Sequence, residues 1–291
     1  MAFDHAEAGV DLHIHTTASD GSFSPWEVVA CARKTGLSAI AITDHDTVEG
    51  AREILSAGLP VDLKFITGVE ISSSPPAPYC SQGSFHILGY GIDLDSPPLG
   101  EALAALRRQR ETRNPQMISR LNTLGVPLTL SEVVAEAGGA VVGRPHMAAV
   151  MVRKQAVGSV QEAFDRYLAK GCPAYVEKGR IDFENAVSLI RAAGGLPVLA
   201  HPVTVGLPLG ELEGLLADLT RRGLAGVEAY YSTHSPEFTQ SLLRCAESLG
   251  LLVTGGSDFH GEYKSGIHLG VGKGDLHIPF DCYATLIAAL T

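Results

Sequence analysis

The chain has 291 residues, of which 45% are hydrophobic and 19% are charged, an ordinary globular composition that argues against disorder. With 22 Lys and Arg against 32 Asp and Glu, the net charge is −10, so we expect no basic groove for duplex DNA. No run of about 18 apolar residues occurs, so we expect no membrane span. An anionic substrate stays open, because bound cations can dominate the field of a site.

Cysteine usage and the first residues bear on the compartment. The five cysteines are scattered and form no Cys-x-x-Cys pair, which indicates reduced thiols. The start of the chain lacks the basic stretch and the apolar core of a secretory signal. Together these features predict a cytoplasmic protein.

Short apolar runs recur along the chain, each followed by polar, glycine-rich or helical sequence. Several runs are too continuously apolar for strands with one wet face, which indicates strands buried on both sides. Their alternation with helices favours an α/β fold, and their number favours a small barrel over an open sheet. The predicted strands are residues 10–15, 38–43, 64–70, 85–91, 196–201, 226–231 and 251–255.

Capping residues mark helices between these strands. Ser24 begins a capping box with proline at the first helical position, and Gly36 is expected to end that helix. Ser235 begins another helix, which is expected to end at Gly250.

The alternation breaks in one region, where the pattern is helical from about residue 99 to residue 170. Proline-rich sequence precedes this region and Gly171 follows it, as is typical of a domain boundary. We therefore expect a helical insertion, residues 98–171, between two parts of a barrel, residues 1–97 and 172–291. Its predicted helices are residues 99–124, with a break at Pro115, 130–137 and 159–170.

The predicted insertion carries a local basic cluster in an otherwise acidic protein. Arg107, Arg108, Arg110 and Arg113 lie in its first helix. One interpretation is a solvated helix face, and the other is a contact to phosphate.

Histidines and carboxylates stand at or just after the predicted strands. His13 and His15 are two apart on the first strand, so their side chains leave the same face. Asp258 and His260 repeat that spacing after the last strand, and the carboxyl ends of parallel strands gather at one rim. His86 begins its run, so this strand is expected to be irregular or reversed. The other members of the set are Asp44, His45, Glu70, His201 and His234.

This set of residues predicts a metal site. A lone histidine is more often a satisfied core or surface residue, but a cluster of unpaired polar groups at converging strand ends would be costly to desolvate. Nitrogen and oxygen ligands without cysteine fit Mn²⁺, Fe²⁺ and Zn²⁺. Roughly ten ligands exceed what one ion can use, so we expect two or three ions that share a carboxylate and activate a bridging water.

The motifs around these residues resemble the PHP family (polymerase and histidinol phosphatase) of amidohydrolase-like barrels. The matching segments are DLHIHTTASDGSFSP (11–25), AITDHDTVEG (41–50), GVEIS (68–72), FHILGYGID (85–93), AHP (200–202), VEAYYSTHSPE (227–237) and GGSDFHG (255–261). The insertion, with GRPH at 143–146, is similar to a subgroup of phosphatases acting on nucleotide 3′,5′-bisphosphates and a related 5′–3′ exoribonuclease.

The resemblance implies a distorted (β/α)7 barrel with three metal positions, the first two sharing Glu70. Mn²⁺ is the expected ion, with Fe²⁺ or Zn²⁺ as alternatives. The implied ligands are His13, His15, Glu70 and Asp258 for the first position, Glu70, His86 and His201 for the second, and Asp20, His45 and His260 for the third.

The resemblance also implies contacts to the substrate. Arg144 and His146 would bind a phosphate, since an arginine fork suits phosphate, although an exposed arginine and a surface histidine are the alternative. Lys178 is a candidate for the same anion from its place in the PAYVEKGR segment rather than from the resemblance, because other members of the subgroup carry a different residue nearby. Ser232 and His234 follow the sixth predicted strand, and His234 is a candidate phosphate contact or general acid.

Two further expectations concern carboxylates near the site. Asp258 is expected to act in catalysis as well as in metal binding. Asp44 and Asp46 are interpreted as groups that orient His45 rather than as ligands.

The expected function is that of a metal-dependent phosphoesterase that removes a terminal phosphate from a nucleotide. The leading hypothesis is removal of the 3′-phosphate of a nucleoside 3′,5′-bisphosphate by a metal-bridging hydroxide. The alternatives are a 5′–3′ exoribonuclease acting on short 5′-phosphorylated RNA, a histidinol-phosphate phosphatase, and a non-catalytic PHP scaffold. The expected partner is thus a phosphorylated small molecule, or short RNA, and neither duplex DNA nor a membrane.

Overall fold

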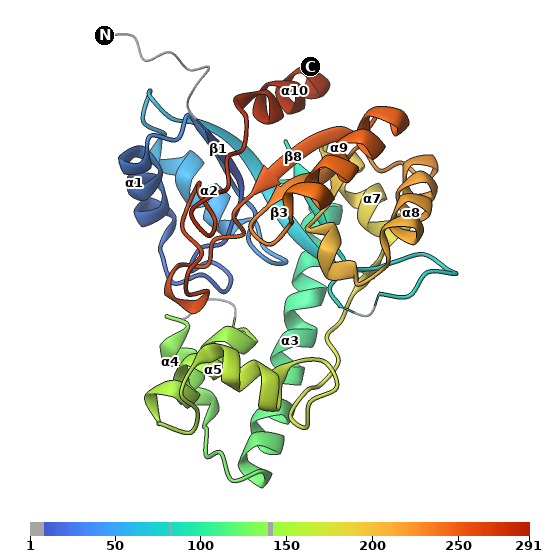
Figure 1. The fold of residues 1–291 in the computed structure, drawn as a ribbon. Helices are drawn as coiled ribbons and strands as arrows, with labels where there is room; N and C mark the ends of the chain where they lie inside the picture. Colours follow the sequence, from blue (N-terminus) through green and yellow to red (C-terminus); the bar gives the residue numbers. More distant parts are fainter. Residues whose placement is uncertain (1–8, 82, 139–141) are drawn as a thin grey trace.

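The computed structural model describes residues 9–81, 83–138 and 142–291. Its centre is a ring of strands in the order β1-β2-β3-β4-β6-β7-β8, with the short β5 paired to β3 (Figure 1). The expected distorted (β/α)7 barrel is therefore confirmed. The strands are β1 (Val10–Ile14), β2 (Ala39–Ile42), β3 (Lys64–Ser74), β4 (His86–Tyr90), β5 (Ile181–Asp182), β6 (Leu196–Leu199), β7 (Gly226–Tyr231) and β8 (Leu252–Gly256).

Strand direction in the barrel explains the position of His86. Neighbouring strands of the ring are parallel except β4, which is antiparallel to both β3 and β6. The expected reversal of this strand is confirmed. Because β4 starts where the parallel strands end, its first residue, His86, lies at the same rim as their carboxyl ends.

The ring closes between β1 and the residues that follow β8. Ile14 forms a parallel bridge with Phe259, and the Asp258 N–H donates a hydrogen bond to the His13 carbonyl. Closure thus brings the predicted ligands on and just after β1 close to those that follow β8.

Helices cover the outside of the barrel (Figure 1). The expected caps are present, because the Ser24 side chain accepts a hydrogen bond from the Glu27 N–H, and Gly36 and Gly250 end their helices at φ of 76° and 66°. These helices are α1 (Pro25–Thr35), α2 (Glu49–Ala57), α7 (Phe183–Ala192), α8 (Leu209–Arg221), α9 (Pro236–Leu249) and α10 (Phe280–Leu290).

The region of the predicted insertion is helical, and one long helix, α3 (Pro97–Thr123), connects it to the barrel (Figure 1). Leu99 and Leu103 of α3 belong to the hydrophobic core around the barrel, whereas Met117 and Leu121 belong to a separate core. The other elements of this region are α4 (Leu130–Glu136), α5 (Arg144–Arg153), α6 (Val160–Ala163) and a π-helical turn (Phe164–Leu168). The division into three segments stays a prediction.

The expected break at Pro115 is wrong, because α3 continues through it. Proline in a helix removes one backbone hydrogen bond and crowds the preceding turn. Here the two halves of α3 are buried in different cores, and this packing outweighs the local cost. The predicted helix at residues 159–170 is also shorter than expected and ends in the π-helical turn.

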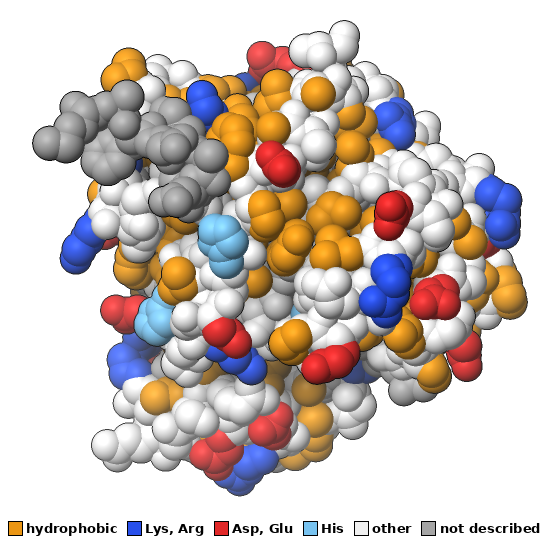
Figure 2. Space-filling model, turned by 45° about the horizontal axis from the view of Figure 1, so that its top comes forward, with side chains coloured by type: hydrophobic (Ala, Val, Ile, Leu, Met, Phe, Trp, Pro, Cys, Tyr) orange, Lys and Arg blue, Asp and Glu red, His pale blue; other side chains and the backbone are white. Residues whose placement is uncertain are grey.

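The surface agrees with the composition. Acidic and basic side chains are interspersed on the face shown in Figure 2. All five cysteines are free. Within the described residues, no helix is long and apolar enough to cross a membrane.

Close approach of β1 and β8 makes a prediction about stability. A Cβ atom added at Gly256 would lie 2.1 Å from the Cβ of His13 and 2.5 Å from its backbone nitrogen. Because backbone atoms must then shift, we expect Gly256→Ala to lower the free energy of unfolding by about 2 kcal/mol. Urea unfolding in the presence of a chelator measures this change without a contribution from bound metal.

Gly210→Ala on α8 is the matched control, because an added Cβ there meets no atom within 4 Å. This variant should be as stable as the wild type or slightly more stable, since alanine favours helix. Equal stabilities of the two variants would contradict the packing argument.

Candidate metal centre

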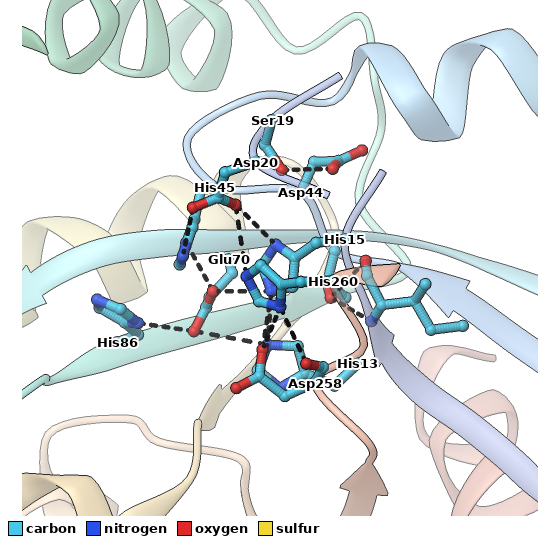
Figure 3. Close-up of polar contacts among 12 residues, drawn as sticks. His13, His15, Ser19, Asp20, Asp44, His45, Glu70, His86, Asp258 and His260 are labelled. Atoms are coloured by element: carbon cyan, nitrogen blue, oxygen red, sulfur yellow. Dashed lines mark hydrogen bonds and ion pairs between the residues drawn. The ribbon is translucent and has the colours of Figure 1, made fainter. Parts of the chain in front are cut away.

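Strand ends bring all nine predicted metal ligands to one end of the barrel, where most of them point toward a common centre (Figure 3). Most of them lie near or after the carboxyl end of a parallel strand, Glu70 lies within β3, and β4 supplies His86 at its start. All are buried except His45, whose side chain is 15% exposed. They are His13, His15, Asp20, His45, Glu70, His86, His201, Asp258 and His260.

Glu70 lies in the middle of this cluster. Its Oε1 atom is 2.7 Å from His86 Nδ1 and 2.8 Å from His201 Nε2. Its Oε2 atom is 2.6 Å from His45 Nδ1 and 3.3 Å from His15 Nε2. One carboxylate therefore faces histidines of more than one predicted metal position, as a bridging ligand must.

Two further carboxylates complete the cluster. Asp258 Oδ1 lies 3.3 Å from His15 Nε2 and 3.4 Å from His260 Nδ1. Asp20 Oδ1 lies 3.5 Å from His260 Nε2, and Asp20 Oδ2 lies 3.9 Å from His45 Nε2. These separations are longer than good hydrogen bonds and leave room for ions between the groups.

Unsatisfied ligand atoms support the fit to metal ions. Four buried atoms of the cluster have no partner with hydrogen-bond geometry among the described residues, namely His15 Nδ1, Asp20 Oδ1, His45 Nδ1 and Glu70 Oε2, although the last two lie 2.6 Å apart. Buried polar atoms in proteins are rarely left without partners. Histidine and carboxylate atoms also converge within 4.8 Å in four overlapping groups. The donor set and its geometry fit two or three divalent ions, whose identity they leave open.

The charges of the cluster keep its carboxylates ionised. Burial alone would raise the pKa of Glu70, but the nearby charges of His45, His86 and His13 outweigh burial and hold that pKa well below its usual range. Burial likewise opposes ionisation of Asp258, whose pKa is held well below its usual range by Lys264 and by the neighbouring histidines. Both groups are therefore in the form that binds metal.

Glu228 on β7 supports the cluster, and sequence reasoning assigned it no role. This fully buried residue places Oε1 2.9 Å from His13 Nδ1, and its Oε2 accepts a hydrogen bond from the His201 N–H. Such a carboxylate fixes the ring and tautomer of a ligating histidine. The available sequence clue was a glutamate inside an otherwise apolar strand.

Asp44 and Asp46, which are expected to orient His45, form hydrogen bonds to other groups. Asp44 accepts hydrogen bonds from Thr16 and Ser19, so it fixes the loop that carries Asp20. Asp46 accepts hydrogen bonds from Ser72 and is paired with Arg110. Their role in orienting His45 stays a prediction.

A cavity of about 490 Å³ opens onto the cluster. Two predicted substrate residues, Arg144 and Lys178, line it together with the ligands. The Arg144 guanidinium lies 5.4 and 5.5 Å from the ring centres of Phe164 and Tyr175 and donates to the Leu168 carbonyl. The aromatic rings and the backbone carbonyl that hold Arg144 carry no net charge. Its positive charge is therefore available to an anion.

Lys178 is held at the edge of the metal cluster. Its Nζ atom lies 2.9 Å from Ser72 Oγ and 2.9 Å from His86 Nε2. Burial lowers the pKa of Lys178 to about 7. Its amino group is thus within reach of any anion that approaches His86.

The other predicted substrate residues are not among those that line this cavity. Buried His146 accepts a hydrogen bond from the Gly143 N–H, and Ser232 donates to the Ser257 carbonyl. His234 Nδ1 lies 2.8 Å from the Ala229 carbonyl, which leaves Nε2 as the unprotonated atom of the neutral ring. Contacts of these three residues to substrate stay predictions.

Tyr231 and Lys264 also line the cavity, and sequence reasoning missed both contacts. The Tyr231 hydroxyl donates to Asp258 Oδ2 at 2.8 Å, and Lys264 Nζ donates to the same atom at 2.5 Å. They hold Asp258 through Oδ2, whereas the histidines face its Oδ1 atom.

Comparison with known proteins decides the family. The PHP domain model matches residues 11–112. A 5′-3′ exoribonuclease of Haemophilus influenzae is 34% identical over 86% of this chain and 89% of its own. The chain belongs to the PHP family. This confirms the family expected from the sequence motifs. The chain is a metal-dependent phosphoester hydrolase.

Two further PHP relatives cover nearly the whole chain. A 3′,5′-nucleoside bisphosphate phosphatase of Chromobacterium violaceum is 32% identical over 90% of this chain and 91% of its own. The solved structure of a Bifidobacterium adolescentis protein, assigned as a metal-dependent phosphoesterase, superposes with a TM-score of 0.84 at 30% identity. That superposition covers 97% of this chain and 96% of the other, so the helical region is shared as well as the barrel.

The position of Glu228 makes a prediction about metal affinity. Glu228→Gln keeps the size of the side chain but removes the charge that holds His13, so we expect about 10- to 100-fold weaker metal binding. Competition with a chelating dye measures the affinity. The control is Glu247→Gln on the exposed side of α9, which should bind metal like the wild type. Equal affinities of both variants would show that Glu228 does not support the ligands.

Proposed function

We propose that this PHP enzyme removes the 3′-phosphate from nucleoside 3′,5′-bisphosphates. The observation that carries the proposal is one cavity that joins the ligand cluster to Arg144 and Lys178. Among the described residues, neither cation has a carboxylate within ion-pair distance. A second phosphate would satisfy them while the first lies at the ligand cluster. The name of the Chromobacterium relative supports this choice of substrate.

The residues divide the work between the reacting phosphate and its anchor. Divalent ions bound by the cluster would polarise the reacting phosphate and lower the pKa of a water molecule. Glu70 and Asp258 hold negative charge at the cluster, and Glu228 fixes His13 within it. Arg144 and Lys178 would bind the second phosphate and so orient the ester bond.

The surroundings of His234 bear on proton transfer to the leaving group. Burial lowers the pKa of His234, and its Nδ1 faces a backbone carbonyl. A neutral ring of this tautomer accepts at Nε2 and cannot donate there. A hydrogen-bond acceptor role for His234 therefore fits better than that of a general acid.

A 5′–3′ exoribonuclease is the second candidate, because the Haemophilus relative carries that name. The same two cations could hold the next phosphodiester of a short 5′-phosphorylated RNA. Substrate comparison, rather than the metal cluster, must separate the two candidates. Histidinol phosphate has one phosphate and would leave the anchor empty.

Phosphate release tests the proposed function. Protein loaded with Mn²⁺ should release phosphate from adenosine 3′,5′-bisphosphate, and a chelated sample should release none. Short 5′-phosphorylated RNA serves as the competing substrate at equal concentration. Faster turnover of the RNA would favour the exoribonuclease, and turnover of neither would contradict both candidates.

Loss of ligands separates an enzyme from a scaffold. We expect the double variant His13→Ala with Asp258→Ala to lose phosphate release while it keeps a folded far-ultraviolet circular dichroism spectrum. Removal of two groups from one position leaves that position without enough ligands to hold an ion. Turnover that survives both substitutions would contradict the assigned ligand set.

A further inference from the structure

Arg113 on α3 is a buried arginine without a charged partner among the residues that the structure describes. Its exposed fraction is 5%, and its Nη2 donates only to the adjacent Asn114 side chain, at 3.2 Å. Its Nε atom has no hydrogen-bond partner among the described residues, and no carboxylate there lies within ion-pair distance. Burial of an unpaired charge destabilises a fold, so the position requires another explanation.

The groups around Arg113 increase this cost. It lines a small cavity together with Arg110, Arg144 and Lys178. Of these three, Arg110 is paired with Asp46, whereas the other two have no carboxylate partner within ion-pair distance in the part of the chain that the structure describes. Burial and the charges of Arg110 and Arg144 lower the pKa of Arg113 to about 10. Three cations that lack carboxylate partners within residues 9–81, 83–138 and 142–291 therefore converge on one space.

The small cavity adjoins the metal cluster. Asp20 and His45 lie in its wall, and it shares His45, Arg144 and Lys178 with the larger cavity. Its volume is about 90 Å³, which corresponds to a few water molecules at about 30 Å³ each. Such a space accepts a phosphate group but not a nucleoside, and two ligands of the predicted third metal position form one side of it.

We propose that Arg113 binds the second, non-reacting phosphate of the substrate and thereby selects substrates that carry two phosphates. This inference rests on the proposed function and adds the residue that determines its specificity. A phosphate in the small cavity supplies the partner that Arg113 lacks, through charge-assisted hydrogen bonds from the guanidinium. A terminal 5′-phosphate and an internal phosphodiester of RNA share this chemistry.

A purely structural role makes the opposite prediction about stability. If Arg113 held the helical region together, its removal would destabilise the fold. If it serves an anion, its removal relieves an unpaired buried charge. Arg113→Met keeps most of the aliphatic stem, so the two roles can be separated.

Anion binding and stability are measured first, without turnover. Metal-free wild-type protein should bind inorganic phosphate in a calorimetric titration, and Arg113→Met should bind it at least about tenfold more weakly. Without phosphate, the variant should unfold at the same temperature as the wild type or higher. Arg108→Met is the matched control, because Arg108 is exposed on the same helix.

Turnover then tests specificity. For adenosine 3′,5′-bisphosphate, Arg113→Met should raise KM about tenfold or more and leave kcat nearly unchanged. For adenosine 3′-monophosphate, KM should not change, and Arg113→Lys should recover part of the affinity for the bisphosphate. A 5′-phosphorylated dinucleotide distinguishes a terminal phosphate from an internal phosphodiester as the bound group. If the small cavity binds the phosphodiester, Arg113→Met should raise KM for the dinucleotide as well.

Two results would overturn the proposal. The first is equal affinity of Arg113→Met and the wild type for inorganic phosphate. The second is a large loss of stability in the variant with unchanged KM for the bisphosphate. If no nucleotide is hydrolysed, the proposed function fails, while the phosphate titration still decides the role of Arg113.

Discussion

A single buried carboxylate, Glu70, sets the conditions that the rest of the site must meet. Five histidines approach it within 3.6 Å, and it is fully buried. Ionised carboxylates are stable away from water only with opposite charge and hydrogen bonds close by. Those histidines come from β1, from β4 and from the loops after β1, β2 and β6, so no local segment can assemble the site. Barrel closure and the reversal of β4 are what bring them together.

A surrounding layer of carboxylates holds this arrangement in place. Asp11 accepts hydrogen bonds from Ser257 and Gly270, and so ties β1 to the segment that supplies Asp258. Burial raises the pKa of Asp11 to about 6 despite these donors. Asp44 likewise accepts hydrogen bonds from Thr16 and Ser19, and so fixes the loop that carries Asp20. Buried polar networks of this kind specify one arrangement of the site rather than maximise stability.

The sequence predicted what depends on local pattern. Continuous apolar runs located the barrel strands, and residues at their ends located the ligands, including the reversed strand with His86. The role of Glu228 depends on which way one side chain of a strand points, which the pattern GVEAYY does not determine. Pro115 was misjudged because the helix is held by two cores that are remote in sequence.

The arginines of α3 are a second case that the sequence pattern alone does not decide. A run of basic residues on a helix is compatible with a solvated face or with a site, and helical period alone does not decide between them. Arg108 is exposed, whereas Arg110 and Arg113 are buried against the barrel rim. Only the packing of α3 across the barrel separates these two outcomes.

This placement of α3 connects the metal cluster with the cations that lie beside it. Its first turns pack in the core around the barrel, its last turns pack in the helical core, and its buried arginines lie between them, beside the ligands. The metal cluster is built by the barrel, while the cations beside it come from the helical region and the segment that follows it. Substitutions on one helix can therefore change which phosphate ester is held without disturbing a ligand. Relatives about equally similar to this chain are named for RNA and for nucleoside bisphosphates, a difference that such a division of labour permits.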